Sequence, residues 1–212
     1  SRWANIDNVK AGKVRDLTIS DRRKTAPEED LPKDILVNNA GQEFNVIGKI
    51  GNTYTVQFVA TGYTRKAFVE NVKAGKVRDP YHRSVYGVGY QGEYKKPHYW
   101  RQAKQLWQNM LKRCYSTKDT KGYYGKGVSV DDRWQCFANF IEDLPKLDNF
   151  QGWLDGQNGN KQKYNLDKDL KVPDNKVYSH EVCSFVTEYE NKSAGAINAR
   201  QLDKLKLKVE KE

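Results

Sequence analysis

The chain has 212 residues, of which 37% are hydrophobic, so it can form one large domain or two small ones. Its 37 Lys and Arg residues outnumber its 27 Asp and Glu residues, which gives a formal net charge of +10. Positive charge of this size indicates a polyanionic partner. No apolar run is long enough to cross a membrane and no signal peptide opens the sequence, so we expect no membrane partner.

The cysteines also bear on the class of protein. Cys114, Cys136 and Cys183 are widely separated and form no C-x-x-C pair, so a structural zinc site is not predicted. Each falls on an apolar helical face by periodicity. We therefore expect three buried thiols in a reducing compartment.

One nine-residue sequence, NVKAGKVRD, occurs twice, at residues 8–16 and 71–79. An identical nonamer indicates two copies of one small module. We expect residues 1–17 to be an incomplete first copy, so that the sequence is a fragment. Residues 18–38 are rich in charges of both signs and contain two prolines, which predicts a linker.

Residues 39–80 are predicted to form the complete β module. The segments Glu43–Ile47 and Thr53–Val59 flank a Gly-Asn turn and predict a hairpin, and a further strand is expected at Lys66–Val72. Three to five such strands fit a small SH3-like barrel. Its predicted core is Phe44, Val46, Tyr54, Val56, Phe58, Phe68 or Val69, and Val72. The basic side chains of this module are Arg65, Lys66, Lys73, Lys76 and Arg78. They either contact DNA or serve only solubility, and the sequence leaves both alternatives open.

The next segment contains glycines 87, 89 and 92 interleaved with Tyr86, Tyr90 and Tyr94. It lacks the Gly-Lys-Ser/Thr of a P-loop, so a nucleotide site is not predicted. The pattern instead predicts an irregular aromatic strand or clamp beside nucleic acid, or a structural ladder of tyrosines.

Positive charge is concentrated between residues 81 and 130. Ten Lys or Arg residues there face only Glu93 and Asp119, a net charge of +8. Basic side chains interleaved with aromatic rings suit a phosphate backbone and unstacked bases, so this segment is the predicted nucleic-acid-binding surface. The candidate residues are Lys95, Lys96, Arg101, Lys104, Lys112, Arg113, Lys118, Lys121, Lys126, Tyr123 and Tyr124.

Two helices are predicted around this segment. Residues Tyr99–Tyr115 place Trp100, Ala103, Trp107, Met110, Leu111 and Cys114 at helical spacing. A second helix is expected to begin after an Asp131 N-cap, to bury Trp134, Phe137, Ile141 and Leu144, and to stop at Pro145.

The segment Asn165–Val186 is predicted to form a strand, a turn, a second short strand at Val177-Tyr178, and a helix capped by Ser179. Asp167 and Asp169 end the first strand and would face the start of that helix. Oxygen ligands on rigid elements suit a divalent ion such as Mg²⁺. A surface hairpin with a solvated charge cluster is the alternative.

Several motifs in order resemble the phage-encoded HNH-type endonucleases. They are W-x-x-M-x-x-R-C at 107–114, Y-x-G-x-x-V at 123–128, W-x-x-F-x-x-F at 134–140, and L-D-K-D at 166–169 followed by V-Y-S-x-E-x-C-x-F-V at 177–186. The match covers roughly residues 84–187. It implies an HNH-like domain at 81–190, followed by a C-terminal helix or tail at 191–212.

The resemblance implies an α+β fold, in which small SH3-like β modules precede an α-rich domain containing a ββα-metal-like hairpin. Asp167 stands where the family has a metal-binding Asp, Lys168 where it has the general-base His, and Val182 where its helix supplies an Asn. The implied catalytic residues are Asp167, Lys168 and His180, with Lys168 stabilising phosphate charge. The implied ligands of Mg²⁺ or Mn²⁺ are Asp167, Asp169, His180 and Glu181.

The implied function is that of a DNA-binding phage protein that hydrolyses DNA phosphodiester bonds as a metal-dependent endonuclease of degenerate HNH type. The alternative is a non-catalytic DNA-binding or inhibitory phage protein that retains the scaffold. The expected partner is double-stranded DNA, with a host protein as a further candidate. A phage origin places the protein in the cytoplasm of an infected bacterial host.

Overall fold

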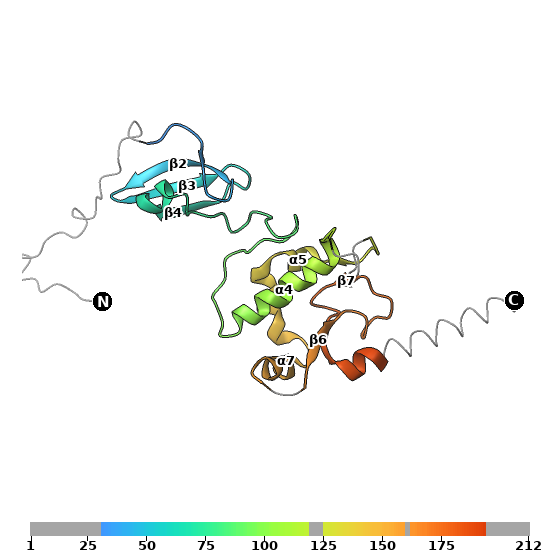
Figure 1. The fold of residues 1–212 in the computed structure, drawn as a ribbon. Coiled ribbons are helices and arrows are strands. Elements are labelled where there is room, and N and C mark those ends of the chain that lie inside the picture. Colours follow the sequence, from blue (N-terminus) through green and yellow to red (C-terminus); the bar gives the residue numbers. More distant parts are fainter. Residues whose placement is uncertain (1–30, 119–124, 160–161, 194–212) are drawn as a thin grey trace, which may run out of the picture. The chain divides into compact units, whose positions relative to one another are not determined.

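The computed structural model describes residues 31–118, 125–159 and 162–193, and the fold is mixed α and β (Figure 1). The chain divides after Asp79 into two compact units. The first nonamer, at residues 8–16, lies outside the described residues. In the described part of the chain, no helix combines the length and apolar character that a membrane crossing requires.

The first unit is a four-stranded antiparallel sheet followed by one short helix (Figure 1). Alternation of buried and exposed residues forms the predicted hairpin, in which Phe44 pairs with Phe58 and Val46 with Val56. The first strand lies within the segment that the sequence assigns to the linker. The elements are β1 (Leu36–Val37), β2 (Glu43–Ile50), β3 (Thr53–Phe58), β4 (Thr64–Phe68) and α3 (Val69–Lys73).

The strand predicted at Lys66–Val72 is wrong in its second half. The strand β4 ends at Phe68, whose side chain is 61% exposed, and α3 follows it. A helix places Val69 and Val72 on one face, where both pack on the core, whereas a strand would point them in opposite directions. Of the two alternatives for the core, Val69 is therefore correct.

The second nonamer completes this first unit. Val77 is buried in the core, and its carbonyl accepts a 2.8 Å hydrogen bond from the Asn38 side chain. Asp79 is also buried and accepts a 2.6 Å hydrogen bond from Thr61. The repeated sequence is thus an integral part of the module's packing.

The second unit packs its helices and two small sheets around one aromatic core that includes Trp107, Trp134, Phe137, Phe140 and Phe185. The strand pair β5–β7 is parallel and the pair β6–β8 is antiparallel. The helices are α4 (Trp100–Tyr115), α5 (Asp132–Gln135), α6 (Phe137–Asp143), the 3-10 turn η2 (Leu144–Lys146) and α7 (Phe150–Gln157). The strands are β5 (Ser129–Val130), β6 (Tyr164–Asp167), β7 (Val177–Tyr178) and β8 (Ser184–Thr187).

The long helix α4 forms as predicted, and Ala103, Trp107, Met110, Leu111 and Cys114 form its buried stripe. All three cysteines are buried and free, as expected, but only Cys114 lies on a helical face: Cys136 is extended between α5 and α6, and Cys183 directly precedes β8. Burial raises the pKa of the Cys114 thiol to about 11 and that of the Cys183 thiol to about 12. The thiols of Cys114 and Cys183 are therefore protonated at neutral pH.

The second predicted helix is divided in two. Asp131 does cap its start, since its side chain accepts a 2.9 Å bond from the Arg133 backbone N–H. The chain becomes extended at Cys136, where it pairs with Tyr90 of the Gly/Tyr segment. That segment approaches α4 closely at Gly89, where a Cβ atom would lie 2.5 Å from Leu111 Cδ1. The glycine is thus needed for packing.

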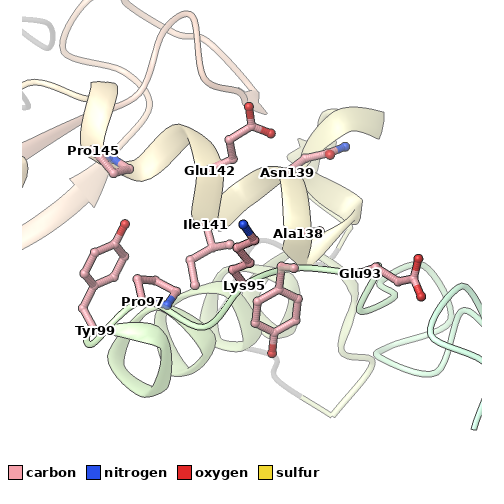
Figure 2. A pocket seen from close by; sticks show the side chains of 10 residues that line it. Glu93, Lys95, Pro97, Tyr99, Ala138, Asn139, Ile141, Glu142 and Pro145 are labelled. Carbon is pink, nitrogen blue, oxygen red and sulfur yellow. The ribbon is translucent and has the colours of Figure 1, made fainter. Parts of the chain in front are cut away.

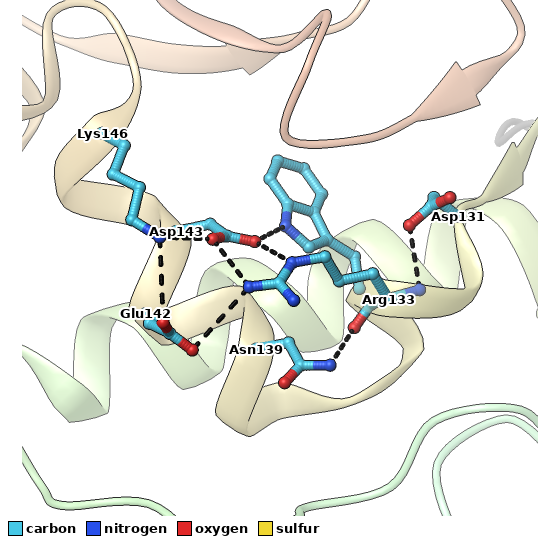
Figure 3. Close-up of polar contacts among 7 residues, drawn as sticks. Asp131, Arg133, Asn139, Glu142, Asp143 and Lys146 are labelled. Atoms are coloured by element: carbon cyan, nitrogen blue, oxygen red, sulfur yellow. Dashed lines mark hydrogen bonds and ion pairs between the residues drawn. The ribbon is translucent and has the colours of Figure 1, made fainter.

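The buried carboxylate of Asp143 joins α5, α6 and η2 (Figure 3). It accepts hydrogen bonds from Arg133 Nε at 2.8 Å, Lys146 Nζ at 2.9 Å and Trp134 Nε1 at 3.1 Å. Burial alone raises the pKa of Asp143, but these donors outweigh it and lower the pKa to about 2. The carboxylate is therefore ionised inside the core and holds three elements together.

Candidate nucleic-acid interface

The end of β6, which pairs with β8, and the loop that follows it carry the two Asp carboxylates predicted to bind metal. Asp167 lies at the end of β6, half-buried, and its Oδ1 accepts backbone N–H bonds from Asp169 at 2.9 Å and Leu170 at 2.7 Å. These bonds turn the chain out of the strand. The second oxygen, Oδ2, makes no hydrogen bond to the residues that the structure describes, so it can bind a ligand.

The Lys168 side chain is turned inward and is only 5% exposed. Its ammonium group donates a 2.7 Å bond to the Asn175 carbonyl and pairs with the Asp169 carboxylate. Asn175 in turn donates to the carbonyls of Lys168 and Val177 at 2.9 and 2.7 Å. These contacts give Lys168 a structural role in closing the loop between β6 and β7.

The helix predicted to begin at His180 is absent from this position. Ser179 accepts a 3.1 Å backbone bond from Cys183, which closes a single turn, and the chain then enters β8. The reason is burial: Cys183–Val186 is a continuous buried run that pairs with β6 and packs on Phe150 and Trp153. His180 and Glu181 are exposed on this turn.

A helix does follow at residues 188–193, eight residues later than predicted. Thr187 and Glu190 form a reciprocal capping box at its start: Thr187 N donates to Glu190 Oε2 at 2.7 Å, and Glu190 N donates to Thr187 Oγ1 at 3.2 Å. The T-x-x-E spacing was the sequence signal for this start. The local order is thus β6, β7, β8 and helix. The predicted pairing of the first strand with Val177-Tyr178 is wrong, because β7 pairs in parallel with β5, and the antiparallel partner of β6 is β8.

The four predicted metal ligands are therefore in different environments. Asp169 pairs with Lys168, while His180 and Glu181 lie on the exposed turn. Over residues 31–118, 125–159 and 162–193, no three His, Cys, Asp or Glu side chains converge to hold a metal ion. Mg²⁺ is often held by one or two carboxylates together with water and substrate phosphate, and Asp167 Oδ2 can supply one such ligand.

The predicted basic residues concentrate on α4, whose sixteen residues include no Asp or Glu. Arg101, Lys112 and Arg113 are exposed, and Lys104 is half-buried. Lys96 lies 4.8 Å above the Trp100 ring. Lys118 and Lys126 are exposed, and Lys121, Tyr123 and Tyr124 lie outside the described residues.

None of the described basic candidates forms an ion pair with a described carboxylate. Ion pairs observed among the described residues of the second unit involve other cations, including Arg133, Lys146, Lys168, Lys171 and Lys192. An exposed, unneutralised group of cations on one helix is the feature expected of a phosphate-binding surface.

One side of α4 borders a groove, which we call the α4–β6 groove. It consists of a hollow of about 430 Å³ between α4 and α7 and a hollow of about 140 Å³ between α4 and β6. Both hollows are lined by Leu106, Asn109 and Tyr164, so they adjoin. The polar residues of the lining are Arg101, Gln102, Gln105, Asn109, Arg113, Gln157 and Asn165, and none of the described lining residues is Asp or Glu.

The wall opposite α4 depends on one glycine. The Tyr164 ring lies against α7 at Gly152, where a Cβ atom would be only 2.8 Å from the ring Cζ. Tyr164 is half-buried, and Trp153 beside it is buried and stacks on Phe185 at 5.0 Å. The aromatic part of the groove is therefore closely packed against α7 and β8.

A separate hollow of about 380 Å³ lies between the segment Glu93–Tyr99 and the α6–η2 region (Figure 2). Its lining includes Lys95 and two acidic residues, Glu93 and Glu142. Acids in this lining would repel phosphate, so Lys95 is less suited to DNA contact than the cations of α4.

Sequence reasoning found the α4 cations but missed the amides beside them. Gln102, Gln105 and Asn109 share one flank of α4 at helical spacing, and this periodicity is visible in the sequence.

Comparison with models of known protein families, with curated proteins and with solved structures finds no match to this chain.

Proposed function

We propose that this chain is a DNA-binding protein whose second unit contacts double-stranded DNA through α4. The observation that carries this proposal is the acid-free composition of α4 together with the exposure of Arg101, Lys112 and Arg113. A cluster of cations without internal partners repels itself until a polyanion neutralises it. Phosphate provides that neutralisation, and releasing its counterions adds to the affinity.

The resemblance to phage HNH-type proteins supports the same class of partner. The antiparallel pair β6–β8 followed by the helix 188–193 supports a ββα-like arrangement, in which β8 and not β7 is the second strand and the helix starts later than predicted. In this proposal the four-stranded first unit is an SH3-like module that positions the chain on DNA or on a host protein.

The binding proposal is tested by the triple variant Arg101→Ala/Lys112→Ala/Arg113→Ala. Each lost phosphate contact is expected to cost about 1 kcal/mol, so the Kd for duplex DNA should rise by about 100-fold. Fluorescence anisotropy with a labelled duplex measures the change. Lys171→Ala is the matched control, because Lys171 is exposed but paired with Asp148 at 2.9 Å, and it should bind like the wild type. Equal loss in both variants, or in neither, would argue against α4.

A second candidate function is metal-dependent cleavage of the bound DNA. The observation in its favour is the fixed Asp167 carboxylate, whose Oδ1 is held by two backbone N–H groups while Oδ2 is not hydrogen-bonded within the described chain. When bound there, Mg²⁺ or Mn²⁺ would polarise a phosphate. Asp167 would hold the ion, and Arg113, which lines a hollow together with Asn165 and Leu166, would orient the strand.

Nicking of supercoiled plasmid in the presence of Mg²⁺ or Mn²⁺ tests this second function. We expect the full chain to nick plasmid and Asp167→Ala to lose at least about 100-fold in rate, since the metal supplies several kcal/mol of charge stabilisation. Absence of nicking in the wild type leaves the non-catalytic DNA-binding function, and nicking that persists unchanged in Asp167→Ala contradicts cleavage through Asp167.

A further inference from the structure

We infer that the α4–β6 groove holds an unpaired segment of a DNA strand, with bases against its amides and phosphates on Arg101 and Arg113. This inference rests on the DNA binding proposed above. It adds the form of DNA that the protein prefers and the residues that contact the bases.

The shape of the site favours an unpaired strand over a duplex. A protein enters the major groove of duplex DNA with a protruding helix or β-ribbon. Here the amides of α4 instead line a hollow of about 430 Å³ whose opposite wall is formed by Trp153 and Tyr164. That volume is typical of sites for small molecules, and a single nucleotide is the part of DNA narrow enough to enter it.

The chemistry of the lining matches base edges. Gln105 Nε2 donates a 2.9 Å bond to Asn109 Oδ1. This bond fixes the two amides side by side and leaves the Gln105 carbonyl oxygen as an acceptor and the Asn109 amide as a donor. Adenine presents the complementary pair, a donor at N6 and an acceptor at N7, and other bases present similar groups on their Watson–Crick edges.

A third amide is poised in the same hollow. The Oε1 atom of Gln102 is buried and has no hydrogen-bond partner among the described residues. An unsatisfied buried acceptor is costly, and an exocyclic amino group of a base would satisfy it after a rotation of the amide. Gln102 therefore adds a second acceptor to the base-binding wall.

The charges of the groove fit the strand's backbone. Arg101 and Arg113 stand at its two ends, roughly 18 Å apart along α4, because each residue of a helix rises about 1.5 Å. That distance is about five stacked nucleotides at 3.4 Å each. No described lining residue is acidic, in contrast to the hollow that contains Glu93 and Glu142.

One end of the groove also borders strand β6. Its narrower end is lined by Asn165 and Leu166, the two residues that precede Asp167 on β6. A strand lying in the groove with a phosphate on Arg113 is thereby brought next to the carboxylate of the second candidate function.

The test compares two DNA ligands with the full chain. One is a labelled duplex of about 30 base pairs and the other is the same duplex with a central bubble of about five unpaired nucleotides. The variants are Gln105→Ala/Asn109→Ala in the groove and Gln108→Ala as the control, since Gln108 is an amide of the same helix that does not line either hollow. Anisotropy gives the Kd of each pair, and far-UV circular dichroism checks that α4 is retained.

We expect the wild type to bind the bubble about tenfold more tightly than the duplex. The groove variant should lose this preference and keep its affinity for the duplex, while Gln108→Ala keeps both. Equal binding of bubble and duplex by the wild type, or a preference that survives in the groove variant, overturns the inference but leaves DNA binding intact. Failure to bind either ligand overturns the proposed function as well.

Discussion

The variant Asp143→Ala is expected to lower the free energy of unfolding by about 3 kcal/mol. The substitution removes the acceptor of the Trp134 indole N–H, which is buried, and it frees the charge of Arg133. Arg133 is 39% exposed and can turn toward water, which reduces the cost below that of a fully buried pair. Urea unfolding followed by tryptophan fluorescence measures the change.

The adjacent residue provides the control. Glu142 also contacts Arg133, at 3.7 Å, but its side chain is 65% exposed. Glu142→Ala should therefore change the free energy of unfolding by less than about 0.5 kcal/mol. Two variants of equal stability would contradict the role assigned to the Asp143 cluster.

The Asp143 carboxylate also makes the free energy of unfolding depend on pH. The pKa of Asp143 falls from its ordinary value of 3.8 to about 2 in the folded chain, so folding favours the ionised form. Its contribution of about 2 kcal/mol is fully present above pH 4 and disappears as the pH falls through about 2. In Asp143→Ala this part of the acid sensitivity should be missing, so the stability difference from the wild type narrows between pH 4 and pH 2.

A second stability effect is expected at Lys168. Lys168→Ala should lower the free energy of unfolding by about 3 kcal/mol, because it removes the bond to the Asn175 carbonyl and leaves a cavity where the buried stem packs. Lys168→Met keeps most of that stem and should cost about 1 kcal/mol, since it also relieves the burial of a charge.

Plasmid nicking by Lys168→Met distinguishes the structural role of Lys168 from the predicted catalytic role. An anchoring role predicts that Lys168→Met binds and nicks DNA like the wild type. Loss of nicking in a Lys168→Met protein that remains folded would show that the ammonium acts on phosphate, against the inward orientation described above.

The local elements could largely be predicted from the sequence, because their patterns are local. The apolar spacing of α4, the Asp131 cap and the hairpin of β2 and β3 each follow from residues within one or two turns of one another. The α+β class follows from these elements together.

The errors arise where tertiary burial overrides a local signal. Ser179 is a good helix cap in isolation, but the apolar run that ends at Val186 is buried on both faces when it pairs with β6. Burying this apolar run as a strand stabilises the fold more than a helix starting at Ser179 would, so the strand forms. Likewise, nothing in the L-D-K-D sequence reveals that Lys168 points inward toward Asn175, since that contact depends on the path of the loop.

The candidate interface was predicted in part. The cations Arg101, Lys112 and Arg113 follow from composition, because an acid-free helix is visible in the sequence. The wall formed by Trp153 and Tyr164 could not be predicted, because α7 and β6 meet α4 only through the fold. Without that wall the α4 amides would not line a groove, so their proposed role in binding bases could not be predicted either.

The dependence of duplex affinity on salt tests the central claim most directly. If the basic surface of the second unit neutralises about five phosphates, a plot of log K against log salt concentration should have a slope near −4.5 for the wild type. The triple variant Arg101→Ala/Lys112→Ala/Arg113→Ala should reduce it to roughly −2, about one unit for each removed contact. A flat response in the wild type, or a slope unchanged in the triple variant, would contradict DNA binding through α4.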